Sequence, residues 1–179
     1  MKKYELTEET VTVYGKTLYR IRAVRDFGSV KTGEFGGYIE KEENLSHFGN
    51  AWVSGNAWVF DNARVYDNAW VFGNAWVFGN AKVYDDAWVC GDAWVSGNAE
   101  VFNTRHFFVQ GPIGSRNGFI TFYRTKDNTV EVRCGCFSGS LQKFVDRVEK
   151  THGGSRYEKE YKLAAELAKV CIRLEGESR

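Results

Sequence analysis

Residues 49–102 read GNAWVS GNAWVF DNARVY DNAWVF GNAWVF GNAKVY DDAWVC GDAWVS GNAEVF, nine consecutive copies of one six-residue pattern. Each copy gives Gly or Asp, then Asn or Asp, then Ala, a variable residue, Val and a second variable residue. Ala and Val lie two positions apart, so both side chains leave the same face of a short strand. The first two residues of each copy tolerate positive φ and satisfy turn backbone locally, which makes them a corner. The repeat therefore predicts a β-solenoid and does not fit a helix.

Three copies close one triangular coil of about 18 residues, so nine copies predict about three coils. Ala and Val point inward and form the core, while neighbouring coils hydrogen-bond as parallel strands. The variable residues point outward. Residues 49–102 are thus expected to form a short parallel β-helix.

Spacing the variable positions at 18 residues sorts them into three outward faces. The first face carries Trp52, Trp70 and Trp88 beside Ser54, Phe72 and Cys90; the second carries Trp58, Trp76 and Trp94 beside Phe60, Phe78 and Ser96; the third carries Arg64, Lys82 and Glu100 beside Tyr66, Tyr84 and Phe102. Two faces are aromatic, which is more apolar surface than a soluble monomer usually exposes. We expect flanking segments or sister subunits to cover them, and a tryptophan ladder could also stack nucleobases or sugars. The candidate oligomer-interface residues are Trp52, Trp58, Trp70, Trp76, Trp88 and Trp94.

The segments on either side of the repeat have different patterns. Residues 1–48 contain an alternating stretch, 11–22, with a glycine in its middle, which predicts a hairpin that caps the solenoid and leads into it. Residues 103–179 predict a small α+β domain. Its three expected strands lie near 105–109, 119–124 and 130–137 and form an antiparallel sheet, followed by helices over about 141–152 and 156–174 that begin at Ser140 and Ser155.

Charge is balanced over the whole chain but not along it. The 24 basic and 23 acidic residues give a formal net charge of +1. Residues 49–102 hold two basic against six acidic residues, and residues 103–179 hold fourteen basic against nine acidic. The basic C-terminal part favours an anionic partner, whereas the balanced total argues against duplex nucleic acid.

Three further features concern location and chemistry. No stretch approaches the ~18 apolar residues that cross a bilayer, and the start lacks the apolar run of a secretory signal. We therefore expect a cytoplasmic protein without a membrane partner. Four dispersed cysteines, Cys90, Cys134, Cys136 and Cys171, predict reduced thiols.

A candidate anion site lies in residues 111–118, which hold three glycines and Arg116. Such a loop lets backbone N–H groups and a guanidinium approach an anion, although no Gly-Lys-Ser/Thr follows to make a Walker loop. The plain alternative is a connection between two strands. The candidate ligand-binding residues are Arg105, Gly114, Ser115, Arg116, Asn117, Arg124, Arg133 and His152.

The thiols of Cys134 and Cys136 lie two apart on a predicted strand, where core packing is the default. With His152 and Cys171 they could bind zinc, but no CxxC pair is present. A nucleophilic pair of Cys136 and His152 would require an exposed, electropositive thiol. We predict no catalytic residue, no metal site and no cofactor.

The approach to the repeat reads DFGSVKTG at 26–33, GGYIE at 36–40 and NLS at 44–46. With the repeat, it resembles the YdcK-like proteins of the hexapeptide-repeat superfamily over roughly the first 100 residues. That resemblance implies left-handed coils, a homotrimer with its axis parallel to the prisms, and a bacterial or phage source. The superfamily includes acyltransferases with a catalytic histidine on the solenoid, but none of the nine copies contains a histidine and His47 precedes them.

The sequence thus favours a non-catalytic, homo-oligomeric β-helix whose basic C-terminal domain binds a nucleotide-like anion or an acidic protein surface. If a phage encodes the protein, the partner would be a host factor. Two alternatives stay open: a hexapeptide-type acyltransferase and a purely structural assembly module.

Overall fold

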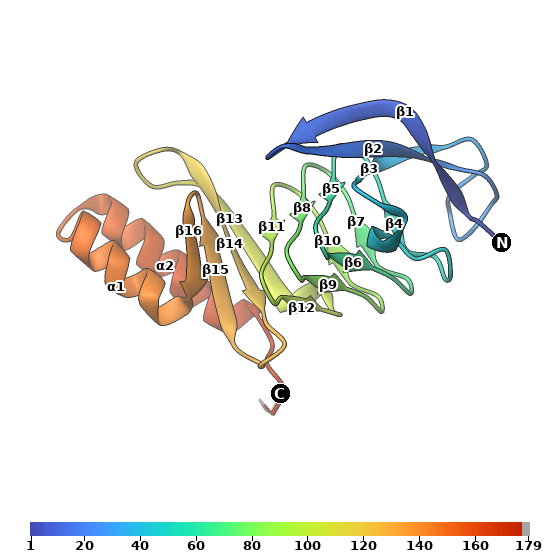
Figure 1. Cartoon of the computed structure of the whole chain (residues 1–179). Helices are drawn as coiled ribbons and strands as arrows, with labels where there is room; N and C mark the ends of the chain where they lie inside the picture. The colour runs from blue at the N-terminus through green and yellow to red at the C-terminus, as the bar shows by residue number, and fades with distance from the viewer. Residues whose placement is uncertain (177–179) are drawn as a thin grey trace.

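The computed structural model describes residues 1–176 and shows a β-solenoid between an N-terminal hairpin and a C-terminal unit of one sheet and two helices (Figure 1). The solenoid strands are two residues long: β4 (Trp52–Val53), β5 (Trp58–Val59), β6 (Arg64–Val65), β7 (Trp70–Val71), β8 (Trp76–Val77), β9 (Lys82–Val83), β10 (Trp88–Val89), β11 (Trp94–Val95) and β12 (Glu100–Val101). They form three parallel stacks in the predicted register, so that Trp70 pairs with both Trp52 and Trp88. The predicted β-solenoid is confirmed.

The core and the corners of the solenoid follow the repeat. Every Ala and Val of the nine copies is at most 1% exposed. The first corner residue adopts positive φ, as at Asp61 (60°) and Gly79 (70°). The second forms ladders of Asn and Asp side chains, in which Asn56 Nδ2 donates to Asn74 Oδ1 over 3.4 Å and Asn74 Nδ2 donates to Asp92 Oδ1 over 3.1 Å. The two inward positions and the two corner positions thus keep the same structural role from coil to coil.

A partial coil precedes the nine copies. Strand β3 (Phe35–Ile39) pairs in parallel with β5, and after η1 (Glu42–Asn44) Leu45 forms a parallel bridge with Val65. The parallel stacking therefore begins before residue 49, where the sequence no longer shows the regular pattern.

The N-terminal hairpin joins β1 (Tyr4–Val13) to β2 (Lys16–Ala23) through Tyr14 and Gly15, both at positive φ. Strand β2 pairs antiparallel with β3 and so extends the sheet β3-β5-β8-β11. The hairpin also lies across the solenoid (Figure 1), where Val13 and Leu18 pack against Phe60. It covers part of the second aromatic face as well as continuing the N-terminal end.

The C-terminal sheet has four antiparallel strands, one more than the three expected: β13 (Phe107–Ile113), β14 (Gly118–Arg124), β15 (Val130–Cys134) and β16 (Phe137–Ser140). Gly135 at φ 55° turns the chain back, so Phe137 pairs with Cys134 instead of continuing the same strand. Helices α1 (Leu141–His152) and α2 (Arg156–Cys171) cover one face, with Ser140 and Ser155 as N-caps.

The other face of this sheet closes the end of the solenoid, which it joins after η2 (Thr104–His106). Thr121 Oγ1 accepts the Trp94 backbone N–H over 2.9 Å, and the Tyr123 hydroxyl lies 3.2 Å from Ser96 Oγ. The open backbone edge of the last coil is thereby partly satisfied. Within residues 1–176, neither helix has the length and apolar character needed to span a bilayer.

A candidate anion pocket beside the last coil

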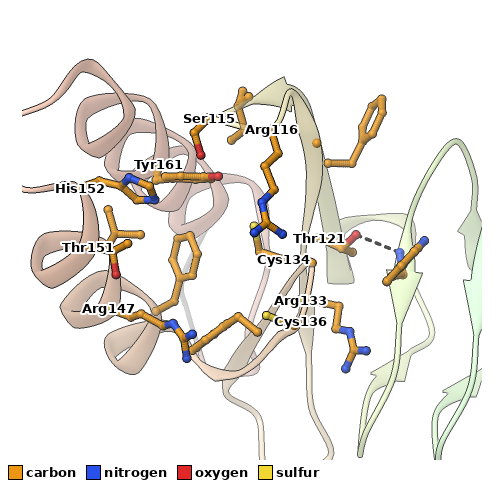
Figure 2. Close-up of a pocket in the computed structure, with 18 of the residues that line it drawn as sticks. Ser115, Arg116, Thr121, Arg133, Cys134, Cys136, Arg147, Thr151, His152 and Tyr161 are labelled. Atoms are coloured by element: carbon orange, nitrogen blue, oxygen red, sulfur yellow. Dashed lines mark hydrogen bonds between the residues drawn. The ribbon is translucent and has the colours of Figure 1, made fainter.

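A pocket of about 580 Å³ lies where the C-terminal sheet, its helices and the last coil meet (Figure 2). The helices contribute Tyr161, His152, Thr151 and Arg147 to its lining. On the side toward the solenoid lie Thr121 and Arg133, and Arg116 lies between the two groups. Asp92 and Trp94 complete the solenoid side. The volume falls within the ~300–1,000 Å³ of small-molecule sites.

The loop that carries Arg116 is fixed by helix α2. Gly114 sits at φ 72°, and a Cβ on it would collide with the Tyr161 hydroxyl, so glycine is required there. The Gly114 N–H donates to Glu160 Oε2 over 2.7 Å. With the loop held in this way, Arg116 extends from it into the pocket toward Cys134 (Figure 2).

The lining is electropositive. It holds three guanidinium groups, those of Arg116, Arg133 and Arg147, against the single carboxylate of Asp92. None of the three forms an ion pair with any carboxylate in residues 1–176. Because guanidinium groups stay protonated in proteins, this charge persists at every physiological pH.

Aromatic rings hold two of these arginines in place. The Arg147 Cζ lies 5.8 Å from the centre of the Phe137 ring. The Arg133 Cζ lies 5.2 Å from the Phe78 ring and 5.9 Å from the Trp94 ring. Cation–π contacts of this kind orient a guanidinium without neutralising it. The pocket therefore combines unpaired positive charge with apolar walls.

The thiol and phenol in the pocket are neutral hydrogen-bonding groups. Burial raises the pKa of the Cys134 thiol. Burial and the neighbouring Cys134 raise the pKa of Tyr161 to about 12. A thiol with a raised pKa is a poor nucleophile at neutral pH. Cys136 lies exposed at the tip of the β15–β16 turn, and no three metal-binding side chains gather anywhere in residues 1–176.

Four of the eight candidate ligand-binding residues meet in the pocket: Ser115, Arg116, Arg133 and His152. Gly114 and Asn117 shape the same loop, where the Asn117 N–H donates to the Gly114 carbonyl over 3.2 Å. Arg105 and Arg124 lie elsewhere. The buried Arg124 pairs with Glu175 at 2.8 Å and packs over Phe102, and the backbone carbonyl of Arg105 accepts the Arg173 N–H.

Arg147 and Thr151 line the pocket without having been predicted as ligand-binding residues, although the sequence contains a signal for both. Phe144 and Val148 define the apolar stripe of α1, and both are buried. Arg147 and Thr151 each lie three positions after one of these residues, so helical spacing places their exposed side chains at the border of that stripe, next to the sheet. Tyr161 carried a similar signal on α2.

Two of the three histidines have structural contacts away from the pocket. His106 Nδ1 accepts the Phe102 N–H over 3.3 Å, and burial lowers the pKa of His106 to about 4. The His47 ring stacks on Tyr4 at 4.3 Å. His152 alone of the three lines the pocket, with its ring centre 5.6 Å from that of Tyr161.

The six candidate interface tryptophans differ in their surroundings. Trp52 is fully buried inside the chain, against Tyr4 and Phe27. Trp88 is 55% exposed. The remaining four, Trp58, Trp70, Trp76 and Trp94, are half-buried. The first face is thus covered at its N-terminal end and open toward its C-terminal end.

Comparison with known proteins bears on the solenoid alone. No curated protein matches the chain. A family model described as the YdcK beta solenoid repeat matches residues 63–79, which lie in the middle of the nine copies. Together with the observed coils, this match shows that the chain carries a β-solenoid of the YdcK repeat type.

Proposed function

We propose that the protein binds an anionic small molecule, without transforming it, in the pocket beside the last coil. The observation that carries this proposal is the set of three guanidinium groups, Arg116, Arg133 and Arg147, that line one pocket without a carboxylate partner. Like charges in one cavity repel, and a bound anion would relieve that repulsion. Phosphate and carboxylate groups also suit the forked geometry of guanidinium donors.

The pocket walls support a ligand with an apolar part as well as a charge. Phe119, Phe137 and Tyr161 contribute ring surface, and Ser115 and Thr151 contribute hydroxyl groups. A small inorganic anion would leave most of this surface unused. We therefore propose an organic anion, such as a nucleotide or an acyl-CoA.

Arg116 is the residue to test, because it projects from a loop and its side chain is exposed. Arg116→Ala should leave the melting temperature nearly unchanged. Loss of a charge-assisted hydrogen bond should weaken binding by about 1.5–3 kcal/mol, roughly ten- to a hundredfold. Thermal shift with nucleotides, cyclic dinucleotides and acyl-CoA finds the ligand, and calorimetric titration gives the affinities.

The matched control is Arg64→Ala, which removes an exposed guanidinium from the third solenoid face. It should bind the ligand like the unaltered protein. If no anion stabilises the unaltered protein, or if a ligand stabilises it and Arg116→Ala equally, the loop is a plain connector and the proposal is wrong.

An acyltransferase would give a different result when the same purified protein is assayed with acetyl-CoA. Release of free thiol from acetyl-CoA, abolished by His152→Gln, would show turnover and contradict a purely binding role. We expect no release. His47 and His106 are unsuited to act as the base because their contacts lie outside the pocket.

We also propose that the chain forms a homo-oligomer, most simply a trimer. The half-exposed Trp88 and its neighbours Trp70 and Phe72 support this, since they leave an aromatic strip on the first face. A trimer would cover three such strips at once.

A further inference from the structure

The second solenoid face carries a stacked ladder of indole rings that ends in the pocket. The centres of the Trp58 and Trp76 rings are 4.4 Å apart with planes inclined by 21°, and those of Trp76 and Trp94 are 4.8 Å apart with planes inclined by 7°. Trp94 belongs to the last coil, and it lines the pocket. The backbone of the solenoid therefore holds one aromatic ring in a fixed orientation at the pocket wall.

Among the ring pairs of residues 1–176, Trp94 stacks on Trp76 alone, so the ladder does not continue beyond Trp94. The repeat ends at Phe102, so no tryptophan follows at the next interval of 18 residues. The Arg133 guanidinium lies over this end of the ladder, with its Cζ 5.9 Å from the centre of the Trp94 ring and 5.2 Å from that of Phe78. The distance to Trp94 exceeds the 4.8 Å between Trp76 and Trp94, so Arg133 lies over the Trp94 ring without stacking on it as closely as the next indole would.

Polar groups surround this end of the ladder. Arg133 Nε is buried and has no hydrogen-bond partner in residues 1–176. Asp92 is oriented by the corner ladder, since its Oδ1 accepts from Asn74 Nδ2 over 3.1 Å. Donors and acceptors around an aromatic platform are what a heteroaromatic ring with polar edges requires.

We infer that the pocket takes a nucleotide, with the base stacked on Trp94 as the next member of the ladder and the phosphates at Arg116 and Arg147. The inference rests on the proposed function, which it narrows to one ligand class. Asp92 and Arg133 face the edge of the base, and Ser115 and His152 lie with the phosphate-binding arginines. In Figure 2 Arg133 lies toward the solenoid, Arg147 and His152 lie on the helix side, and Arg116 lies between them, so one ligand could reach from the base position to the phosphate position.

The test separates the ring from the phosphates by titrating ADP and inorganic pyrophosphate. Trp94→Leu should weaken ADP binding by about ten- to a hundredfold, the range of base–aromatic stacking, and leave pyrophosphate binding unchanged. The control Trp88→Leu, which removes an indole from the first face, should change neither. Retained pyrophosphate binding also reports that Trp94→Leu has folded.

A second variant tests the edge of the base. Asp92→Asn introduces the residue that the repeat itself uses at the corner positions Asn56 and Asn74, so the fold is preserved. It should weaken ADP, whose adenine amino group would donate to the Asp92 carboxylate, about five- to tenfold, and should not weaken pyrophosphate, which has no base.

The outcomes distinguish this inference from the proposed function. If the protein binds pyrophosphate or another anion, but Trp94→Leu changes ADP and pyrophosphate affinity equally or not at all, the stacking inference is overturned and the anion pocket stands. If neither ADP, pyrophosphate nor any other anion binds the unaltered protein, both are overturned.

Discussion

His106 lies where the last coil passes into the C-terminal sheet, and it is 7% exposed. Burial, together with the charge of Arg124, lowers its pKa from 6.5 to about 4. Its Nδ1 accepts a backbone N–H, so the folded protein requires the neutral imidazole. At a pH between these two values the unfolded chain binds a proton that the folded chain does not.

Stability should therefore fall as the pH drops from 6.5 toward 4, with a contribution from His106 of about 1.4 kcal/mol per pH unit. Urea unfolding at several pH values measures this slope. His106→Asn keeps an acceptor but does not titrate, so its slope should be smaller over the same interval. Equal slopes for the two proteins would show that His106 is not the cause.

Single residues are where prediction from sequence was least complete. Ser115 and Arg116 could be found because glycines and an arginine mark a local loop. Arg124 was also selected as a ligand-binding residue, yet it pairs with Glu175, which lies 51 residues further along the chain. Composition shows that an arginine is present, but its partner depends on how distant segments pack.

Among the structural elements, the solenoid gives the sharpest contrast between inward and outward positions. Val77 of β8 is fully buried, whereas the Lys82 side chain of β9 is 48% exposed and pairs with Glu100 at 3.2 Å. Val77→Asp would place a carboxylate among Ala and Val without a partner, at a cost of several kcal/mol. We expect Val77→Asp to unfold the solenoid.

Lys82→Ala is the matched control in the neighbouring strand. A surface ion pair contributes about 0–1 kcal/mol, so its melting temperature should hardly change. Thermal denaturation followed by circular dichroism compares the two variants. Similar melting temperatures would refute the assignment of inward and outward positions.

At the scale of elements, the repeat determined far more than its flanks. The six-residue period fixes strand, corner and register together, because each coil repeats the contacts of the coil before it. The path of the hairpin over Phe60 has no such signal, since it depends on shape complementarity between distant segments. The extra strand β16 follows from one glycine turn, which the apolar pattern of residues 130–137 concealed.

For the whole molecule, the open part of the first face leads to a prediction about assembly. Trp88 is 55% exposed and lies 6.2 Å from Phe72. The proposed trimer should be visible by light scattering at micromolar concentration. Trp88→Glu should dissociate it, because assembly would bury a carboxylate in an aromatic contact. More than half of Trp88 is exposed within the chain, so the fold should survive.

Lys82→Glu, on the third face, should leave the oligomer intact. A monomer at micromolar concentration for the unaltered protein would overturn the assembly proposal. The N-terminal hairpin, Phe27 and the C-terminal sheet would then provide the covering that the aromatic faces receive.

The hairpin that crosses the second face also limits how long the solenoid can be. A stack of identical coils has no intrinsic length, since each coil needs only its two neighbours. The hairpin, in contrast, has a fixed length. Its strands have ten and eight residues, and the Tyr14 ring at its tip lies 6.2 Å from Trp76. Duplicating residues 67–84 would add a complete coil with every internal hydrogen bond satisfied, yet the longer aromatic face would extend beyond the reach of the hairpin. The hairpin, which does not repeat, thus limits the number of coils that the repeating solenoid can have.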